Sequence, residues 1–172
     1  PKFIFLKEKL QTLQEEGHSA LVFSQFIKSL DQMEDILTQQ AIPYFRLDGR
    51  LSAMKRKKVI QAFQESKVPV VFLMSLKAAG FGLNLSKASY VFHLDPWWNP
   101  AVENQATDRV HRIGQTKPVF SYKLVMHQSV EQNIGKIKER KQLLFKQLLD
   151  ESAIVKRDVP LSAADFKMIL GE

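Results

Sequence analysis

Gln105, Arg109 and Arg112 are spaced so that they would share one face of a helix. They stand at positions i, i+4 and i+7 of the stretch 105–115. A guanidinium group is planar and presents a fork of N–H donors that fits a phosphate or a carboxylate. Two arginines on one stripe therefore favour an anionic group opposite them. Asp108 stands four residues before Arg112, so a salt bridge on a solvated helix face is the alternative interpretation.

A second stretch that could take part in ligand binding, residues 75–85, follows the most apolar segment of the chain. Its Gly80 and Gly82 allow the backbone to turn sharply and to approach a ligand closely. The alternative is a plain turn between a strand and a helix.

The stretch 95–100 reads Asp-Pro-Trp-Trp-Asn-Pro. Adjacent side chains cannot both point into one apolar layer, so one of the two indoles is expected to be partly exposed. An exposed indole could pack on a base, a sugar or a neighbouring domain. A rigid corner filled by aromatic rings is the other interpretation.

The sequence also lacks several motifs. It has no phosphate-binding loop of the Gly-x-x-x-x-Gly-Lys-[Ser/Thr] type and no Asp-Glu-x-His box for magnesium. Its four histidines show no spacing typical of zinc ligands, so we expect no metal site. The chain thus carries arginines suited to a nucleotide phosphate without the loop that would cradle that nucleotide.

Composition places the chain among globular proteins. It has 172 residues, of which 45% are hydrophobic, and it has no cysteine, which excludes disulfides and thiolate metal sites. The formal net charge of +7 favours a polyanionic partner, with nucleic acid the first candidate. No apolar run approaches membrane-spanning length, and no signal peptide is visible. Because it begins at Pro1, we expect it to be a piece of a longer protein.

Hydrophobic periodicity predicts strands that alternate with helices. We expect an amphipathic helix that begins near Phe3 and stops at Gly17, a helix over 27–37, and a helix that Ser52 caps and that runs to about 63. A glycine-containing connection over 75–84 and a helix after Pro100 that carries Gln105 to Arg112 are also expected. Strands are expected over 20–23, 44–47, 68–74, 90–94 and 119–125.

Short loops between alternating elements predict an α/β fold in which a parallel sheet is covered by helices on both faces. Ligands of such sheets gather at the carboxyl ends of the strands. Unusual polar residues fall at four of these ends: Ser24–Gln25, Asp48–Arg50, Ser75 onward and Asp95 onward. The basic run 55–58 is either a phosphate-binding helix face or a solvated one.

The pattern changes after Val125. Ser129 and Gln132 form a capping box before a long amphipathic helix, a polar linker covers 150–160, and Ser162 caps a last helix. We therefore predict a lobe over residues 1–127 and a helical extension over 128–172 that packs on it.

Taken in order, these stretches resemble the C-terminal motor lobe of the Swi/Snf family of superfamily-two helicase-like ATPases. Residues 21–26 resemble motif IV of that family, and 47–50 with Arg56 resemble its next block. Residues 75–85 resemble motif V, 95–100 the Asp-Pro-Trp-Trp-Asn-Pro block, and 105–115 motif VI. The resemblance covers about residues 2–150, with order and spacing preserved.

The resemblance implies a RecA-like fold and ATP-driven translocation along double-stranded DNA. It implies that Arg109 and Arg112 act as arginine fingers on the ATP γ-phosphate, with Gln105 setting the geometry. Candidate nucleotide contacts are Gly80, Gly82 and Asp108, while Mg²⁺ would be held mainly by a preceding RecA-like lobe of the same protein. Candidate DNA contacts are Ser24, Gln25, Arg50, Lys77, Asn84 and Trp97.

Two other functions stay open. One is a non-catalytic DNA-binding or protein-docking module that kept the fold, and the other is an RNA helicase lobe. We expect a monomer with no membrane partner, nuclear in a eukaryote and associated with the nucleoid in a bacterium. This fragment alone is expected to be catalytically inactive.

Overall fold

The structure is a computed structural model that describes residues 1–79, 85–97, 118–126 and 131. The chain divides into two compact units, Pro1–Asp95 with Ala101–Leu124 and Pro96–Pro100 with Val125–Glu172. The sheet and the helices that cover it belong to the first unit. Nearly all of residues 128–172 lie outside the described part, so the predicted boundary at 127/128 and the helical extension stay predictions.

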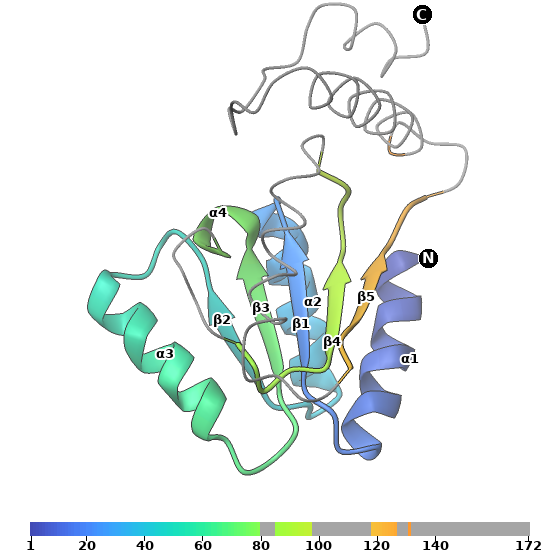
Figure 1. Ribbon diagram of the computed structural model, residues 1–172. Helices are drawn as coiled ribbons and strands as arrows, with labels where there is room; N and C mark the ends of the chain where they lie inside the picture. Colours follow the sequence, from blue (N-terminus) through green and yellow to red (C-terminus); the bar gives the residue numbers. More distant parts are fainter. Residues whose placement is uncertain (80–84, 98–117, 127–130, 132–172) are drawn as a thin grey trace, which may run out of the picture. The chain divides into compact units, whose positions relative to one another are not determined.

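Within the first unit, five parallel strands form one sheet in the order β2-β3-β1-β4-β5 (Figure 1). Ser24 stands opposite Ser75, Leu47 opposite Met74 and Phe23 opposite His93, so the carboxyl ends of neighbouring strands lie at one edge of the sheet. The strands are β1 (Ala20–Ser24), β2 (Tyr44–Leu47), β3 (Val71–Ser75), β4 (Tyr90–His93) and β5 (Phe120–Lys123).

Two helices cover one face of this sheet. The buried leucines of α1 (Lys2–Glu15) and the buried Leu30, Met33 and Leu37 of α2 (Ile27–Gln39) form one core with alternate residues of β1, β3 and β4. The alternation arises because successive side chains of a strand point to opposite faces. Gly17 ends α1 with a φ of +81°, a conformation that suits glycine, and His18 N–H closes the turn on Leu13 O at 2.8 Å.

A third helix covers the other face. In α3 (Ala53–Glu65) the ring of Phe63 is fully buried and lies 4.8 Å from the ring of Phe72 on β3. Phe45 of β2 completes the aromatic group through edge contacts with both rings. The predicted α/β fold with helices on both faces of a parallel sheet is therefore confirmed.

Most predicted elements differ from the observed ones by one or two residues at an end, and two differ in ways that local contacts explain. The third strand begins at Val71 rather than at 68, because residues 66–68 form a turn that Pro69 follows. In this turn Ser66 Oγ donates to Val68 O and accepts from Val68 N–H. The connection predicted over 75–84 begins with a short helix, α4 (Leu76–Ala79). Ser75 Oγ accepts from Ala78 N at 3.3 Å and so caps its first turn.

Candidate functional site

The polar residues at the carboxyl ends of four strands are buried. Ser24 is 0% exposed, Asp48 3%, Ser75 5% and Asp95 8%. We call these four residues the strand-end anchors. Because buried polar groups need hydrogen-bond partners, each anchor is expected to fix the loop that follows its strand. The contacts of Ser24, Asp48 and Ser75 agree with this, and Asp95 accepts a hydrogen bond from Ser24.

Ser24 and Asp95 join the ends of β1 and β4. The Ser24 hydroxyl donates to Asp95 Oδ2 and accepts from the backbone N–H of Phe26 at 3.0 Å. These contacts hold the start of the loop that leads into α2. The predicted DNA contact of Ser24 stays a prediction. Because the Ser24 hydroxyl is hydrogen-bonded within the protein, backbone groups of this loop would have to make that contact.

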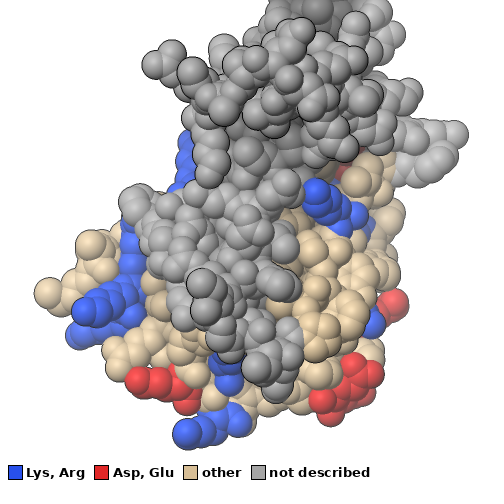
Figure 2. All heavy atoms as spheres, in the orientation of Figure 1, with Lys and Arg blue, Asp and Glu red and all other residues tan. Residues whose placement is uncertain are grey.

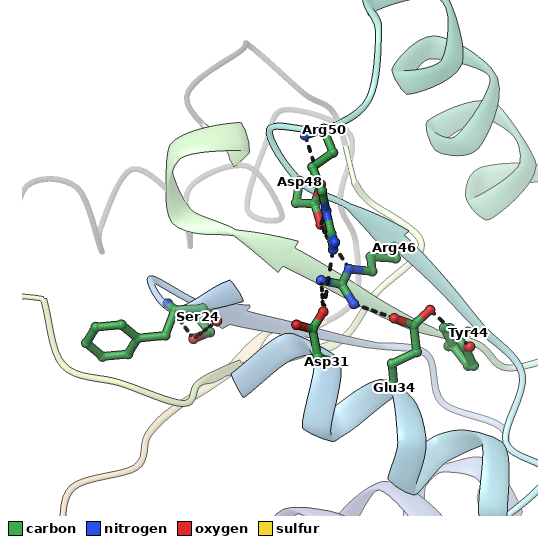
Figure 3. A network of polar contacts seen from close by, with 8 residues as sticks. Ser24, Asp31, Glu34, Tyr44, Arg46, Asp48 and Arg50 are labelled. Carbon is green, nitrogen blue, oxygen red and sulfur yellow. Dashed lines mark hydrogen bonds and ion pairs between the residues drawn. The ribbon is translucent and has the colours of Figure 1, made fainter. Parts of the chain in front are cut away.

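Asp48 holds two arginines at the end of β2 (Figure 3). Its carboxylate accepts from the backbone N–H of Arg50 at 2.9 Å, from Arg50 Nη2 at 2.8 Å and from Arg46 Nε at 3.0 Å. The Asp48 side chain is 4% exposed, whereas that of Arg50 is 63% exposed. Asp48 therefore fixes one edge of the Arg50 guanidinium while the rest of that side chain faces solvent.

Two further carboxylates, from α2, surround Arg46. Arg46 Nη2 donates to Asp31 Oδ1 at 2.6 Å, and Arg46 Nη1 donates to Glu34 Oε2. Glu34 also accepts from the Tyr44 hydroxyl at 3.1 Å. We call Asp31, Glu34, Arg46, Asp48 and Arg50 the arginine–carboxylate cluster. It joins α2 to the end of β2.

The cluster lowers the pKa of two carboxyl groups, those of Asp48 and Asp31. The side-chain hydrogen bond from Arg50 is the largest cause that lowers the pKa of Asp48 to about 2, helped by bonds from the Arg50 backbone and from Arg46 and opposed by burial. The hydrogen bond from Arg46 likewise lowers the pKa of Asp31. Burial acts to lower the pKa of Arg46, but its three carboxylate partners outweigh burial and raise it.

The residues just beyond the anchors are more exposed. Gln25 is half-buried, Arg50 is exposed, and Lys77 is exposed on α4. Each follows an anchor by one or two residues: Gln25 follows Ser24, Arg50 follows Asp48 and Lys77 follows Ser75. Three of the candidate DNA contacts therefore lie just beyond hydrogen-bonded anchors at one edge of the sheet, and their contact with DNA stays a prediction.

One of the remaining candidates lies in the second unit, and the others lie outside the described residues. Trp97 is half-buried in the second unit. The other candidates lie outside the described residues, and their roles stay predictions: Gly80, Gly82, Asn84, Gln105, Asp108, Arg109 and Arg112.

Sequence reasoning missed the partners that support Arg50. Arg46 and Asp48 are two residues apart at the end of a strand, a spacing that places both side chains on one face. Asp31 and Glu34 are likewise neighbours on a helix face. These spacings could have predicted two charged pairs, but the packing of α2 against β2 was needed to join them.

The part of the chain that the structure describes contains no group of acidic, histidine or cysteine side chains that could hold a metal ion. Within those same residues no helix is long and apolar enough to cross a bilayer.

Comparisons with known proteins agree on one family. The helicase conserved C-terminal domain family matches residues 1–114. The chain is 43% identical over 169 residues to the DNA repair protein RAD5 of Cryptococcus neoformans, covering 96% of the chain and 14% of the relative. It is 44% identical over 137 residues to an uncharacterized ATP-dependent helicase of Mycoplasma pneumoniae, covering 80% of the chain and 13% of that protein. These curated relatives are thus several times longer than the chain.

A solved structure gives the same result. The C-terminal part of the Fun30 ATPase domain is 32% identical to the chain and superposes with a TM-score of 0.81, covering 98% of the chain and 51% of the solved one. A likeness of this extent reflects a shared fold and common descent.

Proposed function

Because this chain belongs to the helicase conserved C-terminal domain family, as the C-terminal lobe of a Swi/Snf-type helicase, we propose that it is the second motor lobe of an ATP-dependent translocase on double-stranded DNA. One observation supports this function above the others. The sequence carries a phosphate-suited pair, Arg109 and Arg112, without a phosphate loop of its own. The nucleotide would therefore be held by a preceding lobe, with Mg²⁺ bound mainly there.

In this proposal Arg109 and Arg112 reach the γ-phosphate of ATP bound between the two lobes. Gln105, on the same helix face, sets their geometry, and Gly80, Gly82 and Asp108 line the nucleotide side of the lobe. Guanidinium groups neutralise the charge that spreads over the phosphoryl oxygens as the bond to the leaving group breaks. Contributions of this kind are worth about 10³–10⁵ in rate.

The DNA side of the proposal rests on the strand-end edge. Gln25, Arg50 and Lys77 would contact the phosphate backbone, together with Ser24, Asn84 and Trp97. Such contacts carry no sequence information and weaken steeply as salt rises. Asp48 would hold Arg50 in place for its phosphate, since the bond between them leaves the solvent side of the guanidinium available.

ATP binding would draw the lobes together, and hydrolysis would release them. Alternating grips on the DNA backbone would convert this cycle into stepping. The motor would act as a monomer, in the nucleus of a eukaryote or at the nucleoid of a bacterium.

The test is Arg112→Ala in a protein that joins this chain to its preceding lobe. We expect DNA-stimulated ATP hydrolysis to fall by about 10³-fold or more, while affinity for duplex DNA stays within about twofold because the finger touches ATP alone. Arg50→Ala is the matched control, and it should weaken DNA binding. Equal loss of hydrolysis and of DNA binding in Arg112→Ala would contradict the finger role. Stronger stimulation by RNA than by duplex DNA would favour an RNA helicase lobe.

A further inference from the structure

Three exposed lysines stand on the outer surface of α3. Lys55, Lys57 and Lys58 are exposed, and none of them makes an ion pair with the described residues. We call them the lysine face. Met54, just before them, is 73% exposed. In Figure 2 blue side chains gather on the side of the molecule where α3 lies. The motor function proposed above makes no use of this surface.

The sequence of α3 explains why these lysines have no ion-pair partner among the residues that the structure describes. Residues three and four apart are neighbours on a helix, and none of the positions that neighbour the lysine face holds an acidic residue. The only acidic side chain of α3 is Glu65 at its far end, where Gln61 Nε2 donates to it at 2.8 Å. The basic charge is therefore compensated neither along the helix nor, among the described residues, by its surroundings.

The uncompensated charge of these lysines is unfavourable for the stability of α3 because of where they stand in the helix. They lie in its N-terminal half, where the macrodipole is positive and favours acidic side chains. Lys55 and Lys58 also stand three residues apart, which brings like charges together. Folding stability thus gives no reason for this arrangement, whereas an anionic partner would.

Arg56 belongs to the same basic run but has a structural role. Its Nε donates to the backbone carbonyl of Leu51 at 2.8 Å and so ties the start of α3 to the turn before it. This turn follows Arg50, and Ser52 caps the helix by accepting from Lys55 N. The lysine face is thereby held at a fixed place, only a few residues along the chain from the strand-end edge.

We propose that Lys55, Lys57 and Lys58 bind the phosphate backbone of duplex DNA as a second contact beside the strand-end edge. The inference rests on the proposed function, because it takes the same DNA as its partner. Charge complementarity supports it: the chain carries a net charge of +7, and duplex DNA presents a dense array of phosphates. Lysines act as flexible point charges, which suits a contact that must be made and released at any sequence.

The experiment compares two triple variants of the protein that contains both lobes. In the first, Lys55, Lys57 and Lys58 become Gln, and in the second, Lys7, Lys9 and Lys67 become Gln, which removes the same charge elsewhere. Duplex binding is measured over a range of salt concentrations. Loss of all three phosphate contacts should reduce the slope of log K against log salt by about 2–3. The slope of the second variant should stay close to that of the unaltered protein.

Hydrolysis supplies a second readout. The first variant should need about tenfold more duplex DNA for half-maximal stimulation of ATP hydrolysis, because each lost phosphate contact weakens binding. An unchanged salt slope, or equal losses in both variants, would overturn the inference. So would unchanged duplex binding with lost binding to polyglutamate, since that would identify an acidic polypeptide as the partner. Absence of any stimulation by DNA in the unaltered protein would instead count against the proposed function.

Discussion

Two groups of basic residues lie within a short part of the chain, and they differ in how their charge is compensated. At the end of β2, Arg46 bonds to Asp31, Glu34 and Asp48, and Arg50 shares Asp31 and Asp48 with it. The lysine face of α3, a few residues later, has no acidic neighbour on its helix. The first group therefore contributes to the fold and the second contributes little to it.

This difference in charge compensation indicates where a partner is expected to bind. A cation paired within the protein can serve a ligand only with the part of its side chain left over, as at Arg50. An uncompensated cation keeps its whole charge for a partner. If this distinction holds, substitutions in the first group lower stability, whereas substitutions in the second change binding and do not lower stability.

The largest effect is expected from Asp48→Asn. The change removes the charge that both arginines share at a nearly buried site, so the free energy of unfolding should fall by about 2–3 kcal/mol, somewhat below the loss typical of a fully buried pair. Urea unfolding would measure it. Asp35→Asn is the matched control, since Asp35 is exposed on the same helix as Asp31, and it should change stability by less than about 0.5 kcal/mol. Equal losses of unfolding free energy in both variants would contradict the structural role of the arginine–carboxylate cluster.

A smaller loss is expected from Arg46→Gln. The Arg46 side chain is 13% exposed and its guanidinium bonds three carboxylates, but two of these carboxylates are already partly solvated. We expect a loss of about 1–2 kcal/mol in the free energy of unfolding. The double variant with Asp48→Asn should lose less than the sum of the two single variants, because the residues share one network. Strict additivity would show that they act independently.

Acid should weaken the cluster in a defined range. The pKa of Asp48 is lowered from 3.8 to about 2, so its contribution to stability is fully present above pH 3.8 and is lost as the pH falls toward 2. The shift corresponds to about 2 kcal/mol, and solvent screening beside the exposed Arg50 should reduce this to about 1 kcal/mol. The stability difference between the unaltered protein and Asp48→Asn should shrink over this range. A constant difference would contradict the assignment.

The smallest effect is expected from replacing all three residues of the lysine face by Gln. Removing charges that oppose the helix dipole and repel one another should leave the free energy of unfolding unchanged or raise it by about 0.3–1 kcal/mol. Thermal unfolding of the same variants used for DNA binding would measure it. A loss of 1 kcal/mol or more would place these lysines with the paired group.

Much of the fold could be predicted from the sequence. Apolar runs such as 20–23 and 90–94 are too short for helices and follow turn residues, and their alternation with amphipathic segments predicts a parallel sheet. The structure confirms that sheet, and the comparisons confirm the RecA-like lobe and the Swi/Snf resemblance. The edge that gathers Ser24, Asp48, Ser75 and Asp95 follows from the same reasoning.

Which polar residues along that edge are buried and which are exposed could not be predicted from the sequence. Sequence alone does not show that Ser24 is buried against Asp95 whereas Arg50 is exposed, because burial depends on how the ends of β1 and β4 meet. Nor does it show that Asp31 and Glu34 reach Arg46, since that contact depends on how α2 packs against the sheet. The roles of Arg109 and Arg112 stay predictions, because both residues lie outside the described part of the chain.

The most direct test of the two-lobe proposal measures ATP hydrolysis with and without duplex DNA. The chain alone, its preceding lobe alone and the protein that joins them would be compared under the same conditions. We predict that only the joined protein hydrolyses ATP at an appreciable rate and that duplex DNA stimulates it. DNA-stimulated turnover by these 172 residues alone would contradict the proposal that the nucleotide is held by another lobe.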